Sequence, residues 1–285
     1  MKYKIIRALV ATALFIATPL SVASAADMPL KAPPPPPPPV YSWTGFYLGG
    51  NVGGAWTSEQ FSTADPFNSF GLAGSAFTPV NLSSRGSSAI GGVHGGYNWQ
   101  FATSGLIGVE GDFDWTSLKL GIRSAPLNSP FIAANSFTDS NLNVRDLSSI
   151  RGRAGFIVSD FLVYATGGVA FEDRHFFGEV SCPSTGAGAC IRLPEYASAT
   201  LNKVQTGSVF GAGVEYKPPT TNWIFGVEYL NYHFGGFTAL SPTINAATGA
   251  LSPFNASCPG NGSCVSFAQG SVDISAVRAR LSYKF

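Results

Sequence analysis

The stretch that decides the fold runs from residue 46 to residue 56 and reads Phe-Tyr-Leu-Gly-Gly-Asn-Val-Gly-Gly-Ala-Trp. Its even positions carry Phe, Leu, Gly, Val, Gly and Trp, whereas its odd positions hold Tyr47, Asn51 and small residues. Side chains alternate between the two faces of a β-strand, so this period of two predicts a strand with one apolar face and one small or polar face. The same alternation predicts further strands near residues 87–100, 105–117, 143–157, 161–172, 203–217, 222–234 and 271–285.

The predicted connections alternate in length. The short ones are turns of about three to five residues, at residues 101–104, 158–160 and 218–221. The long ones are loops near residues 57–86, 118–142, 173–202 and 235–270. Short turns at one end and long loops at the other, on an even number of strands, are typical of bacterial outer-membrane barrels. We therefore predict an all-β fold, an eight-stranded antiparallel up-and-down transmembrane β-barrel.

The composition favours a barrel in lipid over the alternative of a soluble β-sandwich. Only 12% of the residues are charged, against about 25% in ordinary soluble domains. A sandwich would turn charged faces to water, but here the alternate faces carry Gly, Val, Leu and aromatic residues. The apolar content is too high for a disordered chain. Because 17 Lys and Arg face 16 Asp and Glu, a strongly basic nucleic-acid binder is excluded, and we expect no nucleic-acid partner.

Aromatic residues gather at both ends of the predicted strands. They are Trp43, Trp99 and Trp223 at the periplasmic ends, and Trp56, Phe113 and Trp115 at the opposite ends. Amphipathic rings collect at the two membrane–water interfaces, so we expect two aromatic girdles around an apolar band.

The N-terminus has the features of an export signal. Basic residues precede an apolar run at residues 8–20, and Ala23-Ser24-Ala25 forms a small-residue cleavage site. The run is short and ends in small residues, which favours a signal over a membrane-anchor helix. We predict that residues 1–25 are a cleaved signal peptide.

Residues 26–42 contain the unbroken proline run 33–39. Such a run favours a polyproline II rod without a core of its own, so we predict a proline-rich periplasmic spacer. Contact of the run with a periplasmic partner or the cell wall is the alternative. The barrel domain then takes residues 43–285, in the bacterial outer membrane and surrounded by outer-membrane lipid.

The last strand alternates up to the C-terminus itself. Its apolar face is made by Val277, Ala279, Leu281, Tyr283 and Phe285. This set resembles the C-terminal signal by which the barrel assembly machinery recognises outer-membrane barrels. We therefore expect that machinery to be a partner of the chain.

Several segments resemble one known family. They are Asp-Met-Pro-Leu-Lys-Ala at 27–32, the proline run, Trp-Thr-Gly-Phe-Tyr-Leu-Gly-Gly-Asn-Val-Gly-Gly at 43–54, Ile-Arg-Gly-Arg-Ala-Gly at 150–155, Tyr-Ala-Thr-Gly-Gly-Val-Ala at 164–170, and the last strand. The likeness is to small α-proteobacterial proteins of the outer-membrane immunogenic, opacity-like porin family. It implies an eight-stranded barrel, surface exposure and, loosely, the label of a porin.

If the apolar face points outward, a set of charged residues points into the barrel. They are Glu110, Asp112, Arg151, Arg153, Glu228, Arg278 and Arg280. Gly-Val-Glu followed by Arg-x-Arg occurs twice among them, which predicts two similar arrangements of opposite charges on neighbouring strands. The interior of an eight-stranded barrel is just wide enough for side chains, and buried charges persist only when paired. We predict a charge layer that packs the lumen; a narrow or gated ion path is the alternative.

The four cysteines fall in the last two long loops, at Cys182, Cys190, Cys258 and Cys264. Their spacings lie outside the usual zinc pattern, so we expect no metal site. An oxidising compartment favours disulfides, and pairing within each loop closes the smaller rings. We predict the bonds Cys182–Cys190 and Cys258–Cys264.

The histidines His94, His175 and His233 do not suggest catalysis. A nucleophile needs an oriented base, and none of the three has a Ser two residues further on, the spacing that places both on one face of a strand. The sequence holds no GxxxxGK[ST] phosphate loop, and we expect neither an enzyme nor a cofactor. The function we expect is that of a structural, surface-exposed outer-membrane β-barrel protein that supports envelope integrity, with long extracellular loops for recognition. The alternative is a small-solute porin with a narrow or gated lumen.

Overall fold

The structure is a computed structural model that describes residues 42–65, 77–124, 137–182, 195–242, 244–245, 248–250 and 264–285. The predicted signal peptide and the proline run lie outside these ranges. Within them, no helix is long and apolar enough to cross a membrane.

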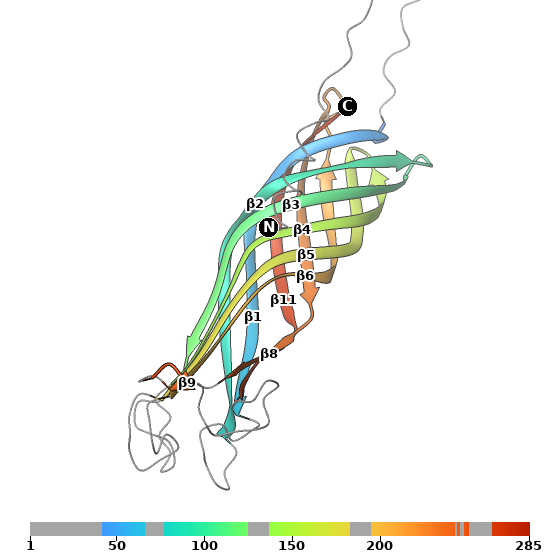
Figure 1. Ribbon diagram of the computed structural model, residues 1–285. Coiled ribbons are helices and arrows are strands. Elements are labelled where there is room, and N and C mark those ends of the chain that lie inside the picture. The colour runs from blue at the N-terminus through green and yellow to red at the C-terminus, as the bar shows by residue number, and fades with distance from the viewer. Residues whose placement is uncertain are drawn as a thin grey trace, which may run out of the picture. The chain divides into compact units, whose positions relative to one another are not determined.

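Eight antiparallel strands form a closed ring (Figure 1). They are β1 (Gly45–Asp65), β2 (Phe77–Gln100), β3 (Gly105–Arg123), β4 (Phe137–Val158), β5 (Phe161–Cys182), β6 (Glu195–Tyr216), β7 (Trp223–Phe234) and β11 (Val272–Lys284). Each of strands β1 to β6 pairs with the next strand in sequence, and β11 closes the ring by pairing with both β7 and β1. The predicted eight-stranded up-and-down barrel is confirmed.

Three shorter strands belong to the fourth long connection: β8 (Phe237–Pro242), β9 (Ile244–Asn245) and β10 (Cys264–Gln269). β8 and β10 pair with each other in the same register as β7 and β11, beyond short breaks at residues 235–236 and 270–271. They therefore prolong β7 and β11 and do not add a ninth and tenth strand to the ring. β10 also pairs with β1, and β9 pairs with the far end of β6.

Most strands run well beyond the ends that the sequence predicted, and the four predicted loops are too long. β2, for example, begins at Phe77 and not near residue 87. A membrane strand needs only about 9–11 residues, and the predicted ends followed the outward apolar face, which stops where lipid stops. Beyond that point the inward positions stay apolar while the outward ones turn polar: Leu120 is buried and Lys119 is exposed. The strands therefore continue into water around a common core.

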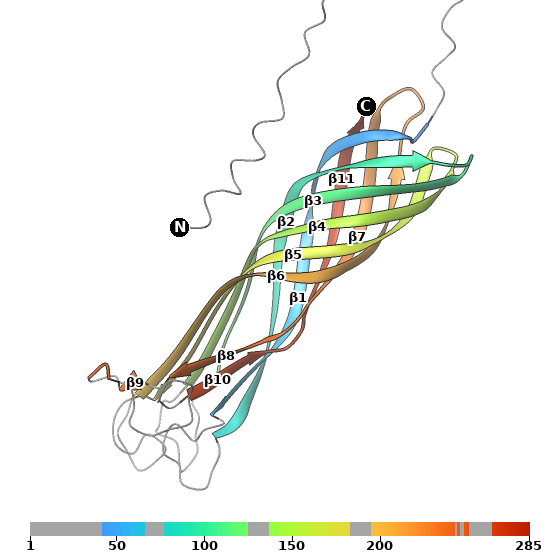
Figure 2. The same cartoon turned by 45° about the vertical axis from the view of Figure 1, so that its right-hand side comes forward.

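The strands bend partway along their length (Figures 1 and 2), and the pairing of β3 and β4 is locally irregular. The register shifts between Trp115 and Leu118 in β3 and between Val144 and Leu147 in β4. Bulges of this kind bend a strand and increase its twist. They divide the barrel into a membrane section and a part that we call the extracellular extension. The extension comprises residues 58–65, 77–88, 117–123, 137–146, 172–182, 195–206, 237–242 and 264–269.

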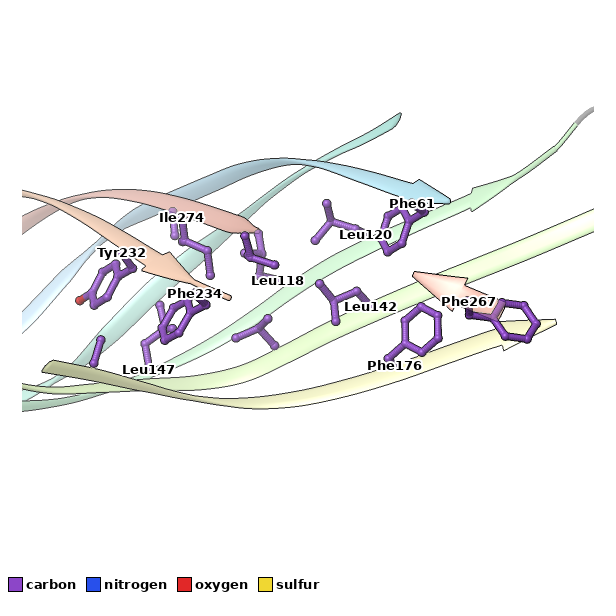
Figure 3. Close-up of a cluster of buried hydrophobic side chains, with 14 of the residues drawn as sticks. Phe61, Leu118, Leu120, Leu142, Leu147, Phe176, Tyr232, Phe234, Phe267 and Ile274 are labelled. Carbon is purple, nitrogen blue, oxygen red and sulfur yellow. The ribbon is translucent and has the colours of Figure 1, made fainter. Parts of the chain in front are cut away.

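One apolar cluster, part of which is shown in Figure 3, runs from the membrane section into the extracellular extension. Within the extension, the ring centroid of Phe176 lies 6.4 Å from that of Phe61, 4.9 Å from that of Phe237 and 6.4 Å from that of Phe267. Burying one such side chain contributes about 1.5–3 kcal/mol. The extension is thus built like a soluble β protein, with apolar residues inside and polar residues outside.

Exposed aromatic side chains surround the membrane section at both ends. At the turn end these include Trp99, Phe101, Phe156, Phe161 and Trp223, and at the other end Trp56, Trp115 and Tyr229. One predicted member is wrong: Trp43 is fully buried. It precedes β1, where its backbone N–H donates to Oε1 of Gln100 at 3.0 Å, and its ring packs inside the barrel mouth.

Candidate functional site in the barrel lumen

The charged residues predicted to face the lumen all lie inside the membrane section. None of these side chains is more than 2% exposed. Asp114 and Glu215 lie among them, so that five carboxylates meet four guanidinium groups. We call this set the lumen charge layer: Glu110, Asp112, Asp114, Arg151, Arg153, Glu215, Glu228, Arg278 and Arg280.

Two ion pairs of the layer join residues that stand opposite each other on paired strands. Glu110 on β3 faces Arg151 on β4, and Glu228 on β7 faces Arg278 on β11. Arg151 Nη2 donates to Glu110 Oε1, and Arg278 Nη2 donates to Glu228 Oε2 at 2.6 Å. These are the two places where the Gly-Val-Glu and Arg-x-Arg patterns recur.

Further contacts tie the two halves together across the lumen. Arg151 also donates to Asp112 Oδ2 at 2.7 Å and to Glu228 Oε1 at 3.1 Å. Arg280 donates to Glu228 Oε1 at 2.9 Å and contacts Glu110. The layer is therefore one network that joins β3 and β4 to β7 and β11.

Two buried tyrosines occupy equivalent places in this network. Tyr47 donates to Glu110 Oε2 at 2.7 Å and accepts from Arg153 Nη1 at 3.0 Å. Tyr164 donates to Glu228 Oε1 at 2.9 Å and accepts from Arg280 Nη1 at 2.8 Å. Each hydroxyl thus uses both its donor and an acceptor capacity, as buried polar groups should.

Inward-facing glycines leave room for these large side chains. A Cβ at Gly213 would lie 2.5 Å from the hydroxyl of Tyr164. At Gly49 a Cβ would lie 2.8 Å from Nε2 of His94, which reaches past this glycine to within 2.7 Å of Ser282 Oγ. Any side chain at either position would displace the buried group beside it.

Buried apolar residues lie on both sides of the charge layer. At the turn end, Trp43, Leu106, Leu162 and Ile224 are each no more than 2% exposed. On the other side stands the long apolar cluster of Figure 3, which begins with residues such as Tyr232 and Ile274 and continues into the extracellular extension.

A second, smaller set of buried charges lies at the junction with the extension. Arg174 Nε donates to Glu172 Oε1 at 2.5 Å, and Arg174 Nη1 donates to the carbonyl oxygen of Gly235 at 3.2 Å, at the break between β7 and β8. Glu59 accepts from the hydroxyl of Thr57 at 2.9 Å. All three charged side chains are buried, and each makes at least one hydrogen bond among the described residues, as burial requires.

Sequence reasoning missed several of these residues. Two of them could have been placed in the lumen from the sequence. Asp114 lies two residues after Asp112 and so points to the same face of the strand, and Glu215 ends a third Gly-Val-Glu segment. His94 and Ser282 are far apart in sequence and meet only because β2 and β11 both pair with β1. Among the described residues, no group of three His, Cys, Asp or Glu side chains is placed to hold a metal ion.

The remaining predicted residues lie elsewhere. The C-terminal set Val277, Ala279, Leu281, Tyr283 and Phe285 points outward and is exposed, and the backbone N–H of Phe285 donates to the carbonyl oxygen of Phe46 at 2.9 Å. The predicted disulfides lie outside the part of the chain that the structure describes. Cys190 and Cys258 fall outside the described residues, and the side chains of Cys182 and Cys264 are not described.

A closed antiparallel ring with an apolar outer band, aromatic girdles and a paired charge layer inside defines a β-barrel of the bacterial outer membrane. The chain belongs to the family described as outer membrane protein beta-barrel domain, whose model matches residues 12–285.

Named relatives agree with this assignment. The chain is 29% identical over 220 residues to the 31 kDa outer-membrane immunogenic protein of Brucella melitensis, covering 75% of this chain and 81% of the relative. The protein of the same name from Brucella suis gives the same values. The resemblance to the α-proteobacterial outer-membrane immunogenic family is confirmed, as is the outer-membrane location.

Solved barrels are similar at low sequence identity. The outer membrane protease OmpT of Escherichia coli gives a TM-score of 0.44 at 6% identity, covering 85% of this chain and 97% of that one. OprG of Pseudomonas aeruginosa gives 0.42 at 12% identity, covering 85% and 96%. The attachment invasion locus protein Ail of Yersinia pestis gives 0.25 at 12% identity, covering 80% and 98%.

Proposed function

We propose that this chain is a structural, surface-exposed outer-membrane protein that supports the integrity of the envelope and whose lumen does not conduct. The observation that carries the proposal is the sequence of layers inside the barrel: an apolar layer at the turn end, the lumen charge layer, and the apolar core that continues into the extracellular extension. A steady aqueous path would have to cross all three.

The electrostatics of the charge layer support the same reading. Its guanidinium groups each contact at least two acidic side chains. Side chains that are ion-paired in this way and no more than 2% exposed lie in contact with one another and not with bulk water. Such a network holds strands together across the lumen, which suits a barrel that bears mechanical and osmotic load.

The proposal assigns recognition to the extracellular extension and the connections beyond it, and assigns no catalysis. The one histidine–serine contact, between His94 and Ser282, is buried within the membrane section, with both residues only 2% exposed. A substrate entering from either end would meet an apolar layer first. This supports a structural role for the pair.

Planar-bilayer recording of the refolded mature chain tests the proposal. We expect no steady conductance in symmetrical salt solution, with a general porin reconstituted in the same way as the positive control. A reproducible, steady channel from the wild-type chain would overturn the proposal in favour of the small-solute porin.

A further inference from the structure

The outer face of the extracellular extension carries a recess that is lined by both polar and apolar residues. It is a cavity of about 440 Å³ over β3, β4, β5 and β6. Its outward side chains form two rows across the four strands, which we call the amide platform: Lys119, Asn143, His175 and Asn202 in one row, and Gly121, Asn141, Phe177 and Thr200 in the other.

We propose that the amide platform binds the saccharide headgroup of a glycolipid in the surrounding outer leaflet. The chemistry of the platform fits a sugar ring, which has an apolar C–H face and a rim of hydroxyl groups that both donate and accept. Phe177 supplies an aromatic ring that is 39% exposed, although it lies on the outer face of a strand in water. Three asparagine amides surround it, and each amide carries both donors and an acceptor.

The existing hydrogen bonds leave polar groups available at the recess. Asn141 donates from Nδ2 to Asp139 at 2.6 Å, so its oxygen is left as an acceptor. Asn202 has its oxygen 2.8 Å from Nδ1 of His175, so its N–H donors are left. Asn143 Oδ1 is buried and has no hydrogen-bond partner among the described residues. A buried acceptor without a partner is costly, and a ligand hydroxyl would satisfy it once the Asn143 amide turns toward the recess.

The imidazole of His175 is held on both sides. Its Nδ1 faces Asn202, and its Nε2 lies 3.1 Å from Oδ2 of Asp173. Opposite, Gly121 has no side chain, and a Cβ there would lie 2.5 Å from Oδ1 of Asn141. The recess is therefore walled by fixed groups at one end and left open by a glycine at the other.

The height of the platform favours a membrane glycolipid as the source of the sugar. Lys119 lies four residues beyond Trp115, which is 59% exposed at the outer girdle. At ~3.3 Å per residue along a tilted strand, this places the platform roughly 10 Å above the girdle, at the level of headgroups. Side chains on the outer face of a barrel wall point along the membrane plane. They therefore point toward neighbouring lipid headgroups.

The pairing of the strands disfavours a peptide ligand. Extended peptides bind by adding a strand to a free sheet edge, whereas the platform lies across strands already paired with one another. An acyl chain would not need the amides. Lys119 adds a positive charge suited to the phosphate or acid groups of a charged sugar.

Binding to the full mature chain in detergent micelles tests the proposal, with deacylated lipopolysaccharide as the probe and saturation-transfer NMR as the readout. We expect the wild-type chain to bind this oligosaccharide. Phe177→Ala and the near-isosteric Asn143→Leu should each weaken binding about tenfold or more. Leu240→Ala is the matched control, because it removes an apolar side chain that is 48% exposed on β8, outside the recess. It should leave binding unchanged.

Folding of each variant is checked by its heat-dependent mobility in gel electrophoresis. If either platform variant fails to fold, Lys119→Gln replaces it, since this exposed side chain is not part of the core. It should weaken binding and reduce its salt dependence.

Three results would overturn the proposal. One is the absence of oligosaccharide binding, and another is binding that survives the platform variants. The third concerns the source of the sugar. If a sulfated extracellular polysaccharide bound more tightly than the deacylated lipopolysaccharide, or if lipid A without core sugars bound equally well, the glycolipid sugar would not be the ligand.

Discussion

Replacing Arg278 should destabilise the barrel, because it removes the counter-charge of a buried carboxylate in the lumen charge layer. Arg278 Nη1 contacts Asp114, and its Nη2 donates to Glu228 at 2.6 Å. Within the described ranges Asp114 has no ion-pair partner other than Arg278, whereas Glu228 keeps Arg151 and Arg280. Arg278→Met therefore leaves one fully buried carboxylate without a counter-charge.

The expected cost follows from that imbalance. Breaking a buried pair by removing one partner typically costs about 3–5 kcal/mol. Adding Asp114→Asn removes the stranded charge, so the double variant should lose only the charged hydrogen bond to Glu228, about 1.5–3 kcal/mol. The two changes should thus be strongly non-additive, as contacting residues in one network are.

Urea unfolding in detergent micelles, followed by tryptophan fluorescence and gel mobility, measures these free energies. Arg85→Met is the control, because Arg85 is exposed on the extension, and its replacement should change stability by less than about 0.5 kcal/mol. A loss below about 1 kcal/mol for Arg278→Met, with no recovery in the double variant, would refute the reasoning. It would mean that the layer is hydrated, as an ion path would be.

Further predictions concern other parts of the chain. Gly213→Ala should destabilise the barrel by about 1–3 kcal/mol, because the added Cβ clashes with the buried Tyr164. Gly54→Ala is the control and should not destabilise it, because a Cβ there meets nothing within 4 Å. The same urea titration compares the two variants. Deleting Phe285 should sharply reduce the yield of heat-modifiable protein in the outer membrane, and an unchanged yield would contradict an assembly role for the C-terminal face. Peptide mapping without reduction should show the bonds Cys182–Cys190 and Cys258–Cys264, one within each loop. Free thiols or a bond between the two loops would show that this assignment is wrong.

The fold and most of the charge layer follow from one property of the sequence, the two-residue period. Once the apolar face is assigned to lipid, the alternation of side chains along each strand places Glu110 and Arg280 in the lumen, and the turn lengths fix the order of the strands. The alternation does not say, however, which side chains meet across the barrel. The contact of Arg280 with Glu110 joins β11 to β3, and it depends on the closure and shear of the ring, which appear only in three dimensions.

The errors have a different physical origin. The strand ends were placed where outward apolar residues stop, but hydrogen bonding between strands continues as long as the inward face has a core to cover. Leu118, Leu142 and Phe176 supply that core above the membrane. Trp43 was assigned to the girdle by residue type, although a residue before the first strand is free to turn inward.

The two sections of the barrel differ in which side chains point inward, because their outer faces meet different solvents. In the membrane section the outside is lipid, so polar groups gather inside and must be paired. In the extension the outside is water, and beyond the buried charges of Glu59, Glu172 and Arg174 the inside is mainly apolar. On β5 the change occurs between Arg174 and Phe176, two successive inward positions. An ion that passed the charge layer would therefore meet the apolar cluster next, which begins at residues such as Tyr232 and Ile274 and continues into the extension, so the two barriers act in series. With the closed lumen proposed above, rearranging the arginine network alone should not open a path, because the apolar cluster that continues into the extension would still block it.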